Sequence, residues 1–94
     1  MTVSSPPDGD LRLHQLSKGQ PATVTGVDES AVVTTLPAGE LERRMIEMGL
    51  VEGSRVVILH EGFPGRDPIA IRVNEHTLAL RRAEARAVRV ALLA

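Results

Sequence analysis

The residues of this sequence that could bind a metal ion are histidines and the acidic residues near them. His60 is followed directly by Glu61, and Asp67 comes next among the acidic residues. Imidazole nitrogens and carboxylate oxygens are both ligands for divalent transition-metal ions. His60, Glu61 and Asp67 therefore form a weak candidate site for Fe²⁺ or Zn²⁺, and His76 is a further candidate ligand.

No spaced multi-ligand motif accompanies these residues, and no metal or other cofactor is expected to be required. His60 closes one predicted strand, and His76 lies in the turn of the next predicted hairpin. In a meander of strands about 20 Å long, the two histidines lie at opposite ends and do not share a metal ion within one chain. A site built across two chains stays open. The competing interpretation is that His14, His60 and His76 are ordinary surface histidines.

Charged residues in the segment 39–54 suggest a second kind of function. Arg43, Arg44 and Glu47 fall on the polar side of a predicted helix, which makes them candidate partner-binding residues. The alternative is a solvated helix face, in which Glu40–Arg44 and Arg43–Glu47 pairs contribute about 0.2–0.5 kcal/mol each. A basic cluster at Arg81, Arg82 and Arg86 is interpreted as solvated surface.

The segment 39–54 has the pattern of one short helix followed by two turns. Its apolar positions fall on one face of a 3.6-residue helix and are Leu41, Met45, Ile46 and Met48. Gly39 is an acceptable N-cap, and Gly49 ends the helix because a left-handed residue costs little only for glycine. Leu50 is expected to fold back on Met45. Arg55 then opens a strand.

Five short segments with strand composition surround this helix, at residues 21–27, 55–60, 69–73, 77–80 and 87–90. Residues 61–68 form a predicted hairpin loop, residues 74–76 a tight turn, and residues 11–16 and 81–86 one helical turn each. The apolar segment 31–36 is either a strand or a loop over the barrel. This pattern predicts a mainly β fold, a small closed barrel of about five strands with one short helix.

Composition limits the remaining possibilities. The chain has 94 residues, of which 43% are hydrophobic, enough for one core without metal or disulfide support. We expect a disordered tail over residues 1–10 and a single domain over residues 11–94. Absence of cysteine excludes disulfides, thiolate catalysis and Cys-based zinc sites.

Charge and aromatic content argue against nucleic acid as a partner. The formal net charge is −1, and there is one aromatic residue, so neither phosphate neutralisation nor base stacking is supported. No signal peptide and no stretch of about 20 apolar residues is present, so we expect a cytoplasmic protein without direct membrane insertion. No nucleophile or phosphate-binding motif suggests an enzyme.

Several motifs follow one another along the chain. They are Leu13-x-x-Leu16-x-x-Gly19, Leu41-x-Arg43-Arg44-Met45-x-x-Met48-Gly49-Leu50-x-x-Gly53, Pro64-Gly65-x-Asp67-Pro68-Ile69 and Leu78-Ala79-Leu80-Arg81-Arg82-x-Glu84-Ala85. Their order and spacing resemble the FeoA family of small cytoplasmic proteins in bacterial ferrous-iron transport. The chain departs from that pattern in its longer, more apolar segment 28–38 and in Glu52, where a proline is frequent. The resemblance implies an SH3-like barrel and a partner, the FeoB-type permease with its cytoplasmic GTP-binding domain.

Two functional hypotheses follow. The first is a non-enzymatic accessory protein that binds and modulates the permease, through its cytoplasmic GTP-binding region or its membrane part. The alternative is a stand-alone domain that binds or senses a transition metal. A homodimer stays open, because the apolar segments 28–38 and 91–94 are candidate self-association surfaces.

Overall fold

The computed structural model describes residues 11–32 and 36–93. The predicted tail over residues 1–10 and part of the apolar segment 31–36 lie outside the described residues. In chain order, the elements are 3₁₀ turn η2 (Leu13–Gln15), strand β1 (Ala22–Val27), 3₁₀ turn η3 (Glu29–Ala31), helix α1 (Glu40–Glu47), strands β2 (Arg55–Glu61), β3 (Ile69–Val73) and β4 (His76–Leu80), helix α2 (Arg82–Ala85) and strand β5 (Val88–Leu92).

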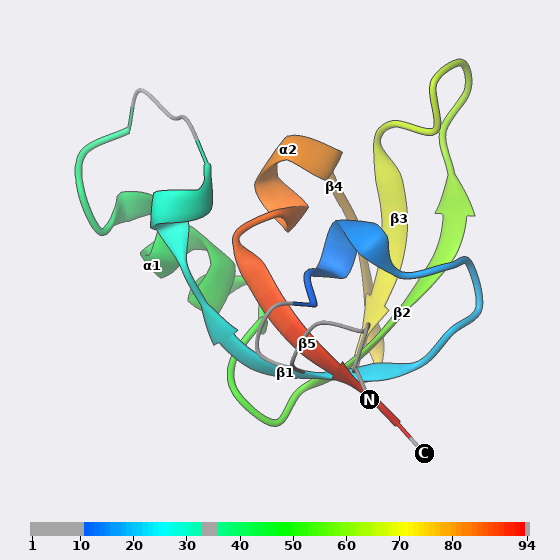
Figure 1. The fold of residues 1–94 in the computed structure, drawn as a ribbon, viewed down its shortest axis with the longest axis horizontal. Helices are drawn as coiled ribbons and strands as arrows, with labels where there is room; N and C mark the ends of the chain where they lie inside the picture. Colours follow the sequence, from blue (N-terminus) through cyan, green and yellow to red (C-terminus); the bar gives the residue numbers. More distant parts are fainter. Residues whose placement is uncertain (1–10, 33–35, 94) are drawn as a thin grey trace, which may run out of the picture.

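The strands form one antiparallel sheet in the order β4-β3-β2-β1-β5. Strands β2, β3 and β4 follow one another as a meander, and α2 then carries the chain across to β5, which pairs with β1. Figure 1 shows the strands curving around the core, with α1 to one side, beyond the end of β1. This arrangement confirms the predicted mainly β fold. None of the described helices is long and apolar enough to cross a membrane.

Alternating residues of the strands fill the core. On β3 the residues predicted to face inward, Ile69, Ile71 and Val73, are fully buried. Ile71 pairs with Ile58 of β2, and Val73 pairs with Val56. The same cluster contains residues from η2, α1, α2 and the other strands: Leu13, Leu16, Ala22, Val24, Leu41, Met45, Leu50, Leu80, Ala85, Ala87, Val88 and Val90. The period-two pattern of these strands therefore predicted which of their side chains lie inside.

Helix α1 ends as predicted. Gly49 adopts a left-handed conformation with φ of 92°, the Gly49 N–H donates to Ile46 O at 2.9 Å, and the Leu50 N–H donates to Met45 O at 2.9 Å. These two bonds form a Schellman motif, which satisfies carbonyls that the helix leaves without partners. Leu50 is consequently folded back into the core.

The prediction that Ile46 lies on the buried apolar face of this helix was wrong. Leu41 and Met45 are buried and Met48 is half-buried, but the side chain of Ile46 is 47% exposed. Ile46 lies about 100° around the helix from Met45, so its side chain points away from the core and toward β1.

Several predicted boundaries were also wrong. Strand β4 begins at His76, because the turn is closed by Asn74 with φ of 55° and the following residue. Strand β5 continues to Leu92, so Ala91 and Leu92 of the predicted tail 91–94 pair with β1. Strand β2 includes Glu61, which the sequence placed in the loop. The described part of segment 28–38 contains a 3₁₀ turn and no strand.

Candidate functional site

The predicted docking face of α1 neutralises most of its own charge. Arg43 donates to Glu40 Oε2 at 2.8 Å and to Glu47 Oε2 at 3.1 Å, which raises the pKa of Arg43 and lowers the pKa of Glu40. Of the two predicted pairs, Arg43–Glu47 forms, whereas Glu40 pairs with Arg43 rather than with Arg44. Arg44 is exposed and has no ion-pair partner among the described residues, so it is the free cation of this face.

The carboxylates of the candidate metal site are bound by arginine instead. Glu61 Oε2 accepts from Arg82 at 2.6 Å and from Arg66 at 3.2 Å. Partial desolvation raises the pKa of Glu61, but the hydrogen bond and charge of Arg66 and the charge of Arg82 lower it overall. Asp67 Oδ1 accepts from the backbone N–H of Arg82 at 2.9 Å. A cation at this position would have to displace two guanidinium groups from Glu61.

The histidines do not complete such a site. His60 pairs with Ala70 near the start of β3, whereas His76 pairs with Val73 at the end of that strand, so they lie at opposite ends as expected. His14 is half-buried, and its Nδ1 atom is buried without a hydrogen-bond partner among the described residues. Burial, followed by the charges of nearby arginines, lowers the pKa of His14.

The described residues therefore do not fit a metal site within one chain. No group of three or more His, Asp or Glu side chains gathers anywhere in residues 11–32 and 36–93. The acidic members of the candidate set already hold arginine. Metal binding by His60, Glu61, Asp67 or His76 stays a prediction, which a titration must test.

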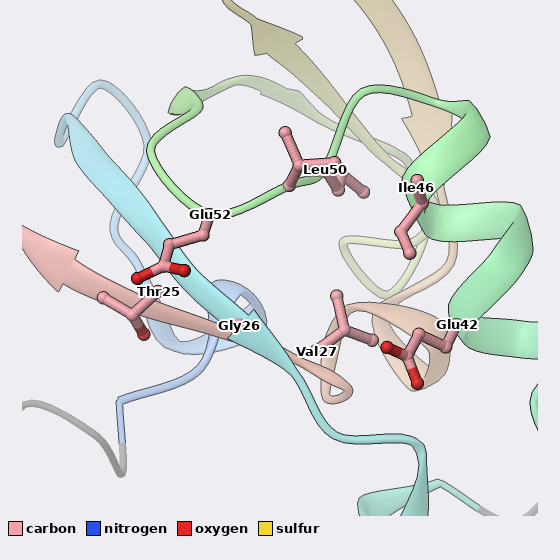
Figure 2. Close-up of a pocket in the computed structure, with 8 residues that line it drawn as sticks. Thr25, Gly26, Val27, Glu42, Ile46, Leu50 and Glu52 are labelled. Atoms are coloured by element: carbon pink, nitrogen blue, oxygen red, sulfur yellow. The ribbon is translucent and has the colours of Figure 1, made fainter.

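A groove of about 200 Å³ lies between α1 and the end of β1. Its lining residues come from β1, from α1 and from the turn that follows α1, and are Thr25, Gly26, Val27, Glu42, Ile46, Leu50, Val51 and Glu52. Figure 2 shows Glu42 and Ile46 on the helix, Val27 across from them on the strand, and Glu52 on the loop that passes over Thr25. The groove thus has an aliphatic interior and a carboxylate toward each end.

Sequence reasoning missed this groove, although one signal for it was present. Ile46 and Val51 are apolar residues that lie outside the core, and their side chains are 47% and 41% exposed. An apolar residue beyond the core face of a short helix is the pattern of a second contact surface. The other wall, formed by Val27, is contributed by a strand far away in the sequence.

The chain is similar to known proteins in both sequence and fold. A profile described as the FeoA domain matches residues 11–92. Over 83 residues, the sequence is 29% identical to the "Fe(2+) transport protein A/Fe(2+) transporter FeoB fusion protein" of Porphyromonas gingivalis strain ATCC BAA-308 / W83. That match covers 88% of this chain but 9% of the fusion protein, so the chain spans less than a tenth of this relative's length.

Two solved structures share the fold. The solution NMR structure of the FeoA protein from Chlorobium tepidum is similar with a TM-score of 0.72 and 32% identity, over 89% of this chain and 71% of that one. The crystal structure of Stenotrophomonas maltophilia FeoA complexed with zinc, described as a procaryotic SH3 domain protein, has a TM-score of 0.69 and 29% identity, over 85% and 88% of the two chains. The fold is therefore SH3-like.

Proposed function

This chain belongs to the FeoA domain family, which is associated with ferrous-iron transport, and from that premise we propose that it is a non-enzymatic accessory protein of this transport, located in the cytoplasm. We propose further that it binds and modulates the cytoplasmic part of a FeoB-type permease. The observation that carries this proposal is the relative named as a fusion with FeoB, because fusion holds two domains at a high effective concentration.

The proposed mechanism is a population shift in the permease. A bound domain shifts a partner's conformational equilibrium only by as much as it binds one conformation more tightly than another. The candidate contact residues from the sequence are Arg43, Arg44 and Glu47 of α1. Arg44 is the most direct candidate, since it forms no ion pair with the described residues, whereas Arg43 is already held by two carboxylates.

The test is retention of the purified chain on the FeoB-type permease of the same cell, with and without a GTP analogue, together with the permease's GTPase rate. We expect retention that depends on the nucleotide, and at least a tenfold loss in the Arg43→Glu/Arg44→Glu variant. Arg72→Glu on β3 is the matched control, because Arg72 is also an exposed arginine. If a well-folded chain is not retained in any nucleotide state, direct modulation is wrong.

Metal binding is the second candidate, because the Stenotrophomonas maltophilia relative is described as complexed with zinc. The test is a titration of this chain with Fe(II) and with Zn(II) under anaerobic conditions. Stoichiometric micromolar binding that His60→Ala or His76→Ala abolishes would support a metal-binding domain. Unchanged binding in both variants would place any bound metal elsewhere.

A further inference from the structure

The groove between α1 and β1 has the size and lining of a pocket for aliphatic side chains. Its volume of about 200 Å³ is smaller than the pockets of about 300–1,000 Å³ that hold small-molecule ligands. Leu50 is fully buried beneath it, while Ile46 and Val51 remain 47% and 41% exposed at its sides. An apolar occupant would remove both exposed side chains from water, which favours binding.

The charge of the groove is negative and uncompensated. Glu42 and Glu52 line it, and neither carboxylate forms a salt bridge with any residue in the described ranges. The adjacent face of α1 differs, because Arg43 is paired there with two carboxylates. Two free carboxylates beside an apolar pocket complement an occupant that carries basic residues on either side of an apolar centre.

The strand wall of the groove has an open edge. The β1–β2 ladder ends at the Thr23–Arg55 pair, and Val24 bonds instead to the preceding turn, through Ser54 O and the Gly53 N–H at 2.8 Å each. Gly26 and Val27 of β1 pair with β5 on the other side, and Thr25 lies at the register shift between Val24 and Gly26. On the groove side, no described strand pairs with these three residues. An extended segment suits such an edge better than a helix does.

We propose that this groove binds an extended segment of a partner protein in which an aliphatic centre is flanked by lysine or arginine. The inference rests on the proposed function in taking the partner to be the permease. It differs from the docking face suggested by the sequence, since it uses Glu42 and Ile46 rather than Arg43, Arg44 and Glu47. The permease would present such a basic, aliphatic segment.

The first test uses an acetylated hexapeptide with a Leu-Val centre and two lysines on each side. Amide chemical-shift changes in the ¹⁵N-labelled chain should concentrate at Gly26, Ile46 and Val51, and affinity should fall as salt screens the carboxylates. A peptide with glutamates in place of the lysines, and one with a Ser-Ser centre, should bind at least tenfold more weakly. Equal binding of all three peptides would overturn the proposal.

Matched variants locate the site. Ile46→Ser should weaken binding at least tenfold, whereas Leu59→Ser should not, because Leu59 on β2 is 42% exposed outside the groove. Glu42→Gln/Glu52→Gln should abolish the salt dependence because it removes both charges, whereas Glu75→Gln in the β3–β4 turn should leave it unchanged. If manganese(II) titration shifts the same amides and competes with the peptide, the groove is a cation site and the proposal is wrong.

A variant that fills the groove but keeps the fold distinguishes a blocked site from loss of binding through misfolding. A Cβ built on Gly26 meets no heavy atom within 4 Å, and the backbone there is not left-handed, so the fold accommodates a side chain at this position of the groove wall. Gly26→Val should therefore stay folded and lose peptide binding. A folded Gly26→Val variant with unchanged affinity would contradict the placement of the peptide against β1.

Retention on the permease separates this inference from the proposed function. If the wild-type chain and Ile46→Ser are retained equally, the permease binds another surface and the groove proposal fails alone. If the peptide binds the groove but the permease does not retain the chain, the proposed function fails and the groove has another protein partner. Loss of retention in Ile46→Ser, but not in Leu59→Ser, supports both.

Discussion

Nη2 of Arg82 lies 2.6 Å from Oε2 of Glu61, and this pair joins the start of α2 to the end of β2. The same guanidinium donates to Arg66 O at 2.7 Å and to His14 O at 2.9 Å. One side chain thus holds the β2–β3 loop, the turn η2 and the last residue of β2 together. Arg82 therefore stabilises the region where the predicted metal ligands lie.

Replacing Arg82 should destabilise the fold. Arg82→Ala leaves the His14 carbonyl and the Glu61 carboxylate, whose bonds to Arg82 are partly buried, without this charged donor, and we expect the free energy of unfolding to fall by about 2 kcal/mol. Urea denaturation measures this change. Arg81→Ala is the matched control, because Arg81 is exposed, and it should change stability by less than about 0.5 kcal/mol. Equal changes in the free energy of unfolding for Arg82→Ala and Arg81→Ala would mean that the hydrogen bonds of Arg82 do not stabilise the fold.

Asp28 makes stability depend on pH at acid values. A hydrogen bond from the Ser30 hydroxyl, followed by bonds from the Ser30 N–H, Arg12 and Arg89, lowers the pKa of Asp28 to about 2. A carboxyl with a lower pKa in the folded state stabilises the fold above its unfolded pKa, and this contribution is lost as pH falls through the folded pKa.

The Asp28→Asn variant tests this linkage. Its thermal midpoint should be below that of the wild type above pH 4, and the gap should close as the pH falls toward 2. Thermal unfolding followed by circular dichroism at pH 2–6 measures the gap. If the two thermal midpoints differ by the same amount at every pH, the charge of Asp28 is not the cause of the stabilisation.

Gly49 is a position where the backbone conformation itself requires glycine. Its φ is 92°, and an added Cβ would meet only Val73 Cγ1, at an ordinary 3.6 Å. Gly49→Ala should therefore cost about 1–2 kcal/mol through backbone strain rather than through a clash. Gly26→Ala, at a position without positive φ, should change the free energy of unfolding by less than about 0.5 kcal/mol. Comparable losses in both variants would argue against the strain explanation.

Ser54 connects the end of α1 to the start of β2. It is the buried polar residue of the described core, at 3% exposure, and its hydroxyl donates to Gly49 O at 2.7 Å. Ser54→Ala removes this donor and should cost about 1–2 kcal/mol in chemical denaturation. Ser17→Ala, at an exposed position, is the control and should have little effect. A stable Ser54→Ala variant would indicate that water replaces the hydroxyl.

Local patterns predicted the elements well where one face of an element is buried. The alternation of Ile69, Ile71 and Val73 placed β3 correctly, and Gly49 with Leu50 placed the end of α1. The prediction for Ile46 was wrong, because periodicity identifies apolar residues but cannot distinguish core from a second apolar surface. Residue 61 was placed in the loop, because the ladder to β3 extends into a segment rich in turn residues.

The sequence by itself determined the strands, the helix and its caps, since propensity, periodicity and glycine conformation act within a few residues. Tertiary structure decided which charges from distant segments meet. Glu61 and Asp67 were predicted as metal ligands, but in the fold both accept hydrogen bonds from Arg82 of α2. Glu42 and Glu52 line one groove because β1 forms the wall opposite α1. Ion pairs and grooves depend on distances between segments far apart in the chain, and residue spacing does not contain those distances.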